Sequence, residues 1–300
     1  MAAPTKPSKK SAPRLEKPRV IAFLNQKGGV GKTTTTVNVG AALADAGYRV
    51  LMVDLDSQAH MTLSLGYDPD TLEHTLHDLF TNPEVAAAQV VRIAEGRPNL
   101  GVLPAKTDLA GLGHEQDEME AVVAATGGSI QTILRDRTAG LRAQFDFILV
   151  DCPPALGLLT VNALAMAGEV VVPMQPHFLA LQGMGKLLET VSLVRDNINP
   201  GLTVAGVVLC MHERQTLLAA EVEKSVREFF EAAAGSAEPW ANAIVFDPAI
   251  RRNIKIAEAP GYAQSVIAYA PESNGAEDYI ALAKAILRHM PDAASEKPAE

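Results

Sequence analysis

The 300-residue sequence contains only two cysteines, Cys152 and Cys210. Two isolated cysteines are too few for a disulfide framework, and no apolar signal-peptide core precedes them, so we expect a protein of the reducing cytoplasm. Long hydrophobic runs are missing as well, since no stretch approaches the roughly 18 apolar residues that cross a bilayer. The sequence therefore argues against a disulfide-stabilised secreted domain and against an integral membrane protein.

Positive charge is also in short supply. The chain has 26 Lys and Arg against 35 Asp and Glu, which gives a net charge of −9 and a pI near 5.3. Bulk charge does not favour nucleic acid, so any DNA contact must come from a local basic patch. The Pro-, Ser- and Lys-rich N-terminus is the exception, with the basic residues Lys6, Lys9, Lys10, Arg14, Lys17 and Arg19 against one acid, Glu16. We expect disordered tails at 1–18 and 291–300.

Between these tails, short apolar runs alternate with helix-like stretches. The runs are rich in Val, Ile and Leu without polar alternation, which is typical of strands buried on both faces of a parallel sheet. They lie at 19–25, 49–56, 99–105, 145–151, 169–174 and 203–211. Helices are expected at 33–47, 116–126, 129–143, 158–167, 180–196, 216–234 and 275–290. This order predicts one three-layer α/β domain over 19–290, a mainly parallel twisted sheet flanked by helices, with 66–98 unassigned.

A glycine-rich turn follows the first expected strand and precedes the first expected helix. It has the form of a P-loop, although Gln26 replaces the first glycine of that motif. Its residues are Gln26, Lys27, Gly28, Gly29, Val30, Gly31, Lys32, Thr33 and Thr34. The glycines allow backbone angles that turn N–H groups toward a phosphate, and the helix N-terminus adds positive charge. We therefore expect ATP and Mg²⁺ here, with Lys32 at the β- and γ-phosphates and the Thr33 hydroxyl on Mg²⁺.

Acidic residues end two other expected strands. Asp54 and Asp56 close the run 49–56. Because side chains two apart on a strand share a face, both are expected to face the ligand crevice. Asp151 ends the run 145–151 and has the form of a Walker B carboxylate, which holds Mg²⁺ through water. The adjacent Cys152 is expected to be a packed small residue, not a nucleophile.

These motifs resemble those of one family of ATPases. The loop QKGGVGKTT, with its second lysine Lys27, resembles the deviant Walker A motif of the ParA/MinD group of SIMIBI-class P-loop NTPases. FDFILVDCPPALGLLTVNAL (145–164) and IRRNIKIAEAPGYAQSVIAYAPESNGAEDYIALAKAIL (250–287) are similar to segments of ParA and Soj proteins. On these motifs the chain is identified as a member of the ParA/Soj family of chromosome- or plasmid-partitioning ATPases.

The resemblance implies roles for individual residues. Lys27 would reach across a dimer to the partner's nucleotide, where its charge helps to neutralise the phosphates. The segment LMVDLDSQAH (51–60) resembles the family pattern VDxDPQxN. In that pattern Asp56 would orient or activate the attacking water, and Asp54 would assist around Mg²⁺. Lys27, Lys32 and Asp56 are thus the expected catalytic set.

The resemblance also implies a functional cycle. In the family, an ATP-bound homodimer binds nonspecific DNA, and a ParB-like protein stimulates a weak ATPase and releases the dimer. The protein would then be cytoplasmic and nucleoid-associated, with no membrane partner. Residues expected to contact DNA are Arg214, Arg251, Arg252 and Lys255, although these cations also fit an ordinary solvated face. The basic N-terminal segment either adds DNA affinity or is an inert solubilising tail.

Three alternatives compete with this interpretation. A MinD-like ATPase would end in a membrane-binding amphipathic helix, but the apolar stripe Ile280, Ala283, Leu287 and Met290 is expected to pack on the core. An amide ligase or an iron–sulfur reductase would need a substrate-pocket motif or two closely placed cysteine ligands, and the sequence offers neither. A ParA-like positioner of another large cargo has the same sequence features as a DNA-partitioning protein.

Overall fold

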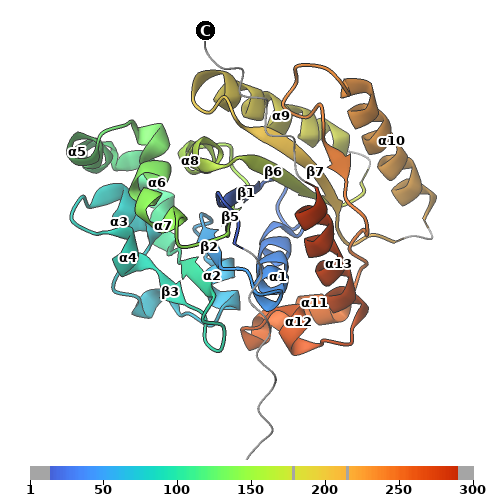
Figure 1. Ribbon diagram of the computed structural model, residues 1–300, viewed down its shortest axis with the longest axis horizontal. Coiled ribbons are helices and arrows are strands. Elements are labelled where there is room, and N and C mark those ends of the chain that lie inside the picture. Colours follow the sequence, from blue (N-terminus) through green and yellow to red (C-terminus); the bar gives the residue numbers. More distant parts are fainter. Residues whose placement is uncertain (1–13, 178–179, 214–215, 290–300) are drawn as a thin grey trace, which may run out of the picture.

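The computed structural model describes residues 14–177, 180–213 and 216–289, with the backbone alone for 180–182. A twisted sheet lies between two layers of helices (Figure 1). Its strands follow the order β3-β4-β2-β5-β1-β6-β7-β8, and every pairing is parallel except that of β3 with β4. The strands are β1 (Arg19–Phe23), β2 (Val50–Asp54), β3 (Arg92–Ile93), β4 (Leu100–Leu103), β5 (Phe147–Asp151), β6 (Glu169–Met174), β7 (Thr203–Leu209) and β8 (Ile244–Val245). The predicted three-layer α/β fold is confirmed.

The helices divide between the two faces of the sheet. One face carries α1 (Lys32–Asp45), α2 (His60–Ser64), α11 (Ile254–Glu258), α12 (Val266–Tyr269) and α13 (Asn274–Arg288). The other carries α3 (Leu76–Thr81), α4 (Ala87–Val90), α5 (Gln116–Thr126), α6 (Ile133–Arg137), α7 (Ala139–Arg142), α8 (Leu158–Met166), α9 (Ala180–Asn197) and α10 (Leu217–Ala233). Short 3-10 turns, including η2 (Thr107–His114) and η4 (Ala259–Tyr262), complete the layers.

Each central strand contributes side chains to the hydrophobic cores on both faces of the sheet. Along β1, Val20 and Ala22 belong to the cluster under α8 and α9, while Ile21 and Phe23 belong to the cluster under α1 and α13. All four side chains are buried, because successive residues of a strand point to opposite faces. This double burial explains why the strands read as continuous apolar runs.

The strand register brings the functional motifs to one edge. Asp151, the last residue of β5, lies opposite Phe23 of β1 and opposite Asp54 of β2. The phosphate loop, which begins at Gln26 shortly after β1, therefore lies beside β5, which ends in Asp151, and β5 in turn lies beside β2, which ends in Asp54. This edge is the carboxyl end of a parallel sheet, where ligands bind in open α/β folds.

The predicted helix 129–143 is interrupted. It forms α6 and α7, which are separated at Thr138 (φ −96°, ψ 0°). The Thr138 hydroxyl donates to the Leu134 carbonyl at 2.6 Å, and back-bonding of this kind bends helices. The two-residue strand β8 was not predicted; it passes so close to Gly206 that a Cβ there would lie 2.0 Å from Ile244 O.

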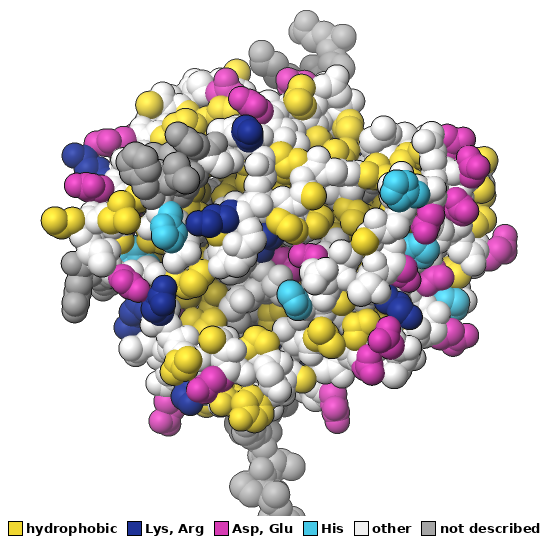
Figure 2. Space-filling view, turned by 180° about the vertical axis from the view of Figure 1, so that it is seen from behind, with side chains coloured by type: hydrophobic (Ala, Val, Ile, Leu, Met, Phe, Trp, Pro, Cys, Tyr) yellow, Lys and Arg dark blue, Asp and Glu magenta, His cyan; other side chains and the backbone are white. Residues whose placement is uncertain are grey.

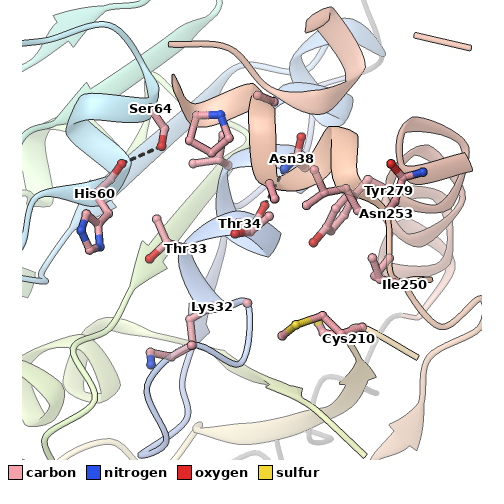
Figure 3. A pocket seen from close by; sticks show the side chains of 18 of the residues that line it. Lys32, Thr33, Thr34, Asn38, His60, Ser64, Cys210, Ile250, Asn253 and Tyr279 are labelled. Atoms are coloured by element: carbon pink, nitrogen blue, oxygen red, sulfur yellow. Dashed lines mark hydrogen bonds between the residues drawn. The ribbon is translucent and has the colours of Figure 1, made fainter. Parts of the chain in front are cut away.

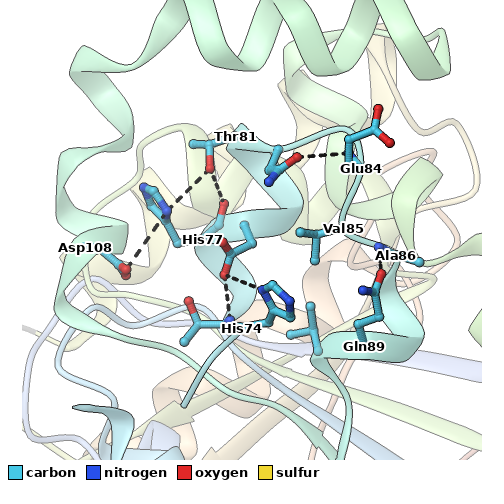
Figure 4. A network of polar contacts seen from close by, with 12 residues as sticks. His74, His77, Thr81, Glu84, Val85, Ala86, Gln89 and Asp108 are labelled. Carbon is cyan, nitrogen blue, oxygen red and sulfur yellow. Dashed lines mark hydrogen bonds and ion pairs between the residues drawn. The ribbon is translucent and has the colours of Figure 1, made fainter. Parts of the chain in front are cut away.

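The unassigned segment 66–98 contains α3, α4 and β3. Its α3 helix buries Leu76, Leu79 and Phe80 against the sheet. A polar network holds the outer side of α3, where His77 Nε2 lies 2.7 Å from Glu115 Oε2 (Figure 4 shows His77 near Thr81 and Asp108). Long-range packing of this kind is not visible in a local sequence pattern.

The ends of the predicted domain, 19 and 290, are only partly described. Residue 290 and the C-terminal tail lie outside the described residues, as do residues 1–13. Leu15, inside the predicted tail, packs against the core cluster of α1 and α13. Arg19, counted among the basic residues of the N-terminus, starts β1 and pairs with Glu169 at 2.7 Å.

Candidate functional site

The phosphate loop has the backbone conformation that the glycines permit. Gly29 and Gly31 have φ of 73° and 94°, a region that residues with a Cβ rarely occupy. Gly28 does not adopt positive φ. Gly31 is the N-cap of α1, and its carbonyl accepts from Thr35 N at 2.8 Å. The positive end of a 14-residue helix therefore points into the loop.

Lys32 and Lys27, the two lysines of the loop, lie in different environments. Lys32 is only 7% exposed, and its Nζ donates to the Lys27 carbonyl at 3.2 Å. Burial lowers the pKa of Lys32, while the nearby Asp151 and Asp56 carboxylates raise it. Lys27 is exposed, and its backbone N–H donates to Asn25 Oδ1 at 3.0 Å. One lysine thus faces the interior of the loop and the other faces outward.

Asp151 is the buried carboxylate of the site. It is fully buried, and neither of its oxygens has a hydrogen-bond partner within the described ranges. Burial and the neighbouring Asp54 raise the pKa of Asp151 well above its usual range, an effect that the Thr33 hydroxyl and Lys32 partly offset. A buried unpaired carboxylate beside a hydroxyl is the donor set that a hydrated Mg²⁺ accepts, so the residues fit this ion.

Asp54 does not face the cleft together with Asp56, as was predicted. The prediction assumed the two-residue period of a strand, but β2 ends at Asp54 and the period stops there. Asp54 is fully buried and does not line the cleft. Its Oδ2 accepts from Thr62 N at 2.9 Å and Thr62 Oγ1 at 2.7 Å, and its Oδ1 accepts from Asp56 N at 3.3 Å. Burial raises the pKa of Asp54 to about 6. Asp54 therefore orders the loop that carries Asp56, and a role beside Mg²⁺ stays a prediction.

Thr62 is a residue that no sequence motif indicated. Its hydroxyl donates to Asp54 and accepts from Ala105 N at 2.9 Å, so one buried side chain joins β2, α2 and the second residue after β4. Asp56, by contrast, lies in the cleft as predicted, where its Oδ1 accepts from Gln58 N at 3.0 Å.

The phosphate loop opens into a cleft of about 1190 Å³. In Figure 3, Lys32, Thr33 and Thr34 lie between His60 on one side and Tyr279 on the other. The far wall is formed by residues 250–254, 256, 257 and 259–261 of the segment that leads through α11 and η4. The cleft therefore joins the phosphate loop to a C-terminal segment more than 200 positions away in the chain.

The residues expected to contact DNA lie partly on that wall. Arg251, Arg252 and Lys255 are close in sequence, and Arg251 and Arg252 line the cleft. Each is paired with a carboxylate: Arg252 Nε with Glu213 at 2.9 Å, Lys255 Nζ with Glu258 at 2.8 Å, and Arg251 with Asp278 at 2.6 Å. Arg214 lies outside the described residues.

The structure also bears on the alternatives. Cys152 and Cys210 are both buried, and no group of three or more His, Cys, Asp or Glu able to hold a metal is found in the described part of the chain. None of the helices described there is long and apolar enough to span a bilayer. Ala283 of the predicted apolar stripe is buried in the core, and Ile280 and Leu287 lie half-buried against α1. Met290 is outside the described residues.

Comparison with known proteins agrees with this geometry. The model of an AAA domain family matches residues 18–204. Sporulation initiation inhibitor protein Soj of Bacillus subtilis is 38% identical over 89% of this chain and 98% of its own length. Chromosome partitioning protein ParA of Caulobacter vibrioides is also 38% identical, over 91% of this chain and 96% of its own.

A solved structure shows the same fold. A protein from Mycobacterium smegmatis called cobyrinic acid a,c-diamide synthase, crystallised with an ATP analogue and magnesium, has a TM-score of 0.72 and 34% identity; the match covers 91% of this chain and 95% of that one. ATP and Mg²⁺ are the two cofactors that the loop and Asp151 predict. From its fold, its phosphate loop and these relatives, the chain belongs to the ParA/Soj family of partitioning ATPases.

Proposed function

We propose that this protein is a weak ATPase that dimerises on binding MgATP, binds nonspecific DNA as the dimer, and thereby segregates or positions DNA. The observation that carries the proposal is the pair of lysines in one phosphate loop, with Lys32 buried and Lys27 exposed. A single subunit needs only the buried lysine to hold its own nucleotide. The exposure of the second lysine supports a contact with phosphate held by another copy.

The loop residues hold the nucleotide in this proposal. Backbone N–H groups of 28–34 and the N-terminus of α1 bind the phosphates, and Lys32 leaves the Lys27 carbonyl for the β- and γ-phosphates. Thr33 and Asp151 hold Mg²⁺, which when bound neutralises charge on the phosphate oxygens. Asp56, which lies in the cleft, orients the attacking water.

The γ-phosphate would act as the link between two subunits. Lys27 of each copy contacts the nucleotide of the other, so the dimer is favoured only while that phosphate is present. Hydrolysis removes the contact, and the subunits separate. A ParB-like protein would accelerate this step, and the cycle would take place in the cytoplasm on nucleoid DNA.

The experiment that tests the proposal is a measurement of mass in solution. Light scattering on the full chain with Mg²⁺ and a non-hydrolysable ATP analogue should show a dimer, and with ADP a monomer. Lys27→Ala should bind the analogue yet stay monomeric, because it retains Lys32. A wild-type chain that remains a monomer with the analogue bound would contradict the proposal.

The alternatives find less support in the structure. A MinD-like helix would need an apolar face for lipid, but Tyr279, Leu282, Ala283 and Ile286 of α13 are buried in the core. Flotation with liposomes and ATP tests this alternative, and we expect no bound protein. A glutamine-dependent amide ligase needs a thiolate nucleophile, whereas burial raises the pKa of both Cys152 and Cys210, the latter to about 11.

A further inference from the structure

Two cations of the proposed DNA-binding edge are held by exposed carboxylates. Arg252 pairs with Glu213, and the two side chains are 64% and 52% exposed. Lys255 pairs with Glu258, with exposures of 45% and 37%. Both cations are thus accessible to a phosphate, but each already has an anionic partner. A DNA phosphate must compete with that partner for the same N–H groups.

The third cation, Arg251, is bound more firmly. Its Nε lies 3.1 and 3.0 Å from the two oxygens of Asp278, whose side chain is only 4% exposed, and Asp278 Oδ2 also accepts from Arg251 N at 3.0 Å. Its NH2 group contacts Glu277 at 3.0 Å as well. Removing Arg251 from Asp278 would leave a buried carboxylate without its partner, which is costly. Arg251 is therefore a structural link between the 250–254 segment and α13.

Glu258 and Lys255 are also held in place by contacts with Tyr269. Its Oε2 accepts from the Tyr269 hydroxyl at 3.0 Å, and Lys255 Nζ lies 5.6 Å from the centre of the Tyr269 ring. Tyr262 stacks on Tyr269 with ring centres 4.8 Å apart. The hydrogen bond from Lys255 lowers the pKa of Glu258, and the same contact raises the pKa of Lys255, so both remain charged at neutral pH.

Carboxylates outnumber cations around these pairs. Three cations at 251, 252 and 255 face the four carboxylates of Glu213, Glu258, Glu277 and Asp278. On the face that Figure 2 shows, the Lys and Arg side chains in the left half lie among Asp and Glu side chains, and the right edge is mostly acidic. A surface of this kind attracts DNA weakly, because affinity for the phosphate backbone depends on uncompensated positive charge.

We propose that Glu213 and Glu258 are built-in competitors of DNA phosphate, which hold Arg252 and Lys255 and keep the affinity of this edge for DNA low, while Arg251 makes no DNA contact. The proposal rests on the proposed function, because it concerns the same DNA-binding state. Exposed ion pairs contribute little to stability, so phosphate can displace the carboxylates, but each displacement reduces the net gain. Weak binding suits a dimer that must leave DNA after each cycle.

The test compares E213Q, E258Q and their double variant with wild type. Anisotropy of a labelled nonspecific duplex would be measured with the full chain, Mg²⁺ and a non-hydrolysable ATP analogue, at low and high salt. Each single variant should bind DNA roughly two- to five-fold more tightly, the range expected for an exposed pair. The gain should shrink at high salt, because it is Coulombic. R252A and K255A should weaken binding, and R251A should alter thermal unfolding more than either.

Two controls separate the competitors from bulk charge. E228Q changes the net charge by the same amount in an exposed pair with Lys224 on α10, and E277Q leaves Arg251 bound to Asp278. Neither should tighten DNA binding. An equal gain of DNA affinity in E228Q would overturn the inference about Glu213 and Glu258 but not the proposed function. The same holds if E213Q and E258Q gain no affinity while wild type binds DNA.

Failure of the proposed function has a different signature. A wild-type chain that forms no nucleotide-dependent dimer and binds no DNA would contradict that function. The inference would then be decided by the variants. If the double variant gains DNA binding and E228Q does not, the inference is supported. If neither variant binds DNA, the inference is overturned.

Discussion

At the residue scale, Asp56 and Lys32 approach the same nucleotide but should fail differently when replaced. Asp56 lines the cleft without bonding to the phosphate loop, so Asp56→Ala should bind ATP, form the dimer and lose turnover. Lys32→Ala should lose nucleotide binding itself, since Lys32 is the buried cation of the loop. Fluorescent-nucleotide titration and phosphate release measure the two properties separately. Turnover by Asp56→Ala at the wild-type rate would show that the assigned role is wrong.

Thr62 offers a second residue-scale prediction, because its hydroxyl satisfies two buried partners. Thr62→Val keeps the shape but leaves Asp54 with one hydrogen bond fewer and Ala105 N without an acceptor. We expect a loss of about 1–3 kcal/mol in the free energy of unfolding, the typical cost of stranded buried polar groups. Thr62→Ser retains the hydroxyl and is the matched control in urea titrations.

The ATPase rate of the same variants tells whether Thr62 also acts on chemistry. Asp54 holds the loop that leads to Asp56, so Thr62→Val should reduce phosphate release even where the protein is fully folded. Thr62→Val with wild-type stability would show that the hydrogen bonds to Asp54 and Ala105 contribute nothing.

At the element scale, a helix or strand could be predicted where residues within it or next to it stabilise it, and could not where distant residues do. The central strands are visible because burial on both faces leaves a continuous apolar run, and α1 is visible because a glycine loop precedes it. The short elements α3 and β8 depend on partners distant in sequence: Glu115 for His77 and Gly206 for Ile244. Such contacts cannot be predicted from the pattern of neighbouring residues in the sequence.

The same reasoning applies to the site. Asp151 and the phosphate loop could be predicted because their motifs stand at strand ends. The hydrogen bonds of Asp54 could not, because a period of two assumes that the strand continues to Asp56. The carboxylate beside Arg252 was also hidden, since Glu213 is some 40 positions from Arg252.

An ion pair joins three of these elements. Arg19 of β1 is 10% exposed, pairs with Glu169 of β6 through two hydrogen bonds of 2.8 and 2.7 Å, and donates to carbonyls at the end of α13. Arg19→Ala leaves Glu169 buried and uncompensated, so it should cost about 3–5 kcal/mol in the free energy of unfolding. Denaturant titration measures this cost.

The control for Arg19 is an exposed pair between a lysine and a glutamate. Lys224→Ala breaks a 3.6 Å pair with Glu228 whose side chains are 75% and 60% exposed. Its effect should be within about 0.5 kcal/mol. Equal effects of the two substitutions would mean that the Arg19 pair does not hold β1, β6 and α13 together.

At the scale of the whole molecule, the fold places two fully buried carboxylates side by side where the sheet ends. Asp54 and Asp151 lie opposite each other in register on β2 and β5, and both are fully buried. Burial disfavours their charged forms and raises the pKa of each. Without a bound cation this arrangement opposes folding, so the site is made at a cost in stability that the rest of the sheet offsets.

That cost should appear as a pH dependence of stability. The pKa of Asp54 rises from 3.8 to about 6 on folding, so between these values the folded state binds more protons than the unfolded state. Its contribution to stability is therefore fully present below pH 3.8 and is lost as pH rises through about 6. A shift of about two units corresponds to roughly 3 kcal/mol.

Asp54→Asn keeps an acceptor for Thr62 and cannot ionise, and it also removes a charge that raises the pKa of Asp151. The free energy of unfolding of the nucleotide-free wild type, relative to that of Asp54→Asn, should thus decrease as pH rises through this interval in urea titrations. A difference that stays constant with pH would mean that Asp54 is not held in its protonated form by the fold.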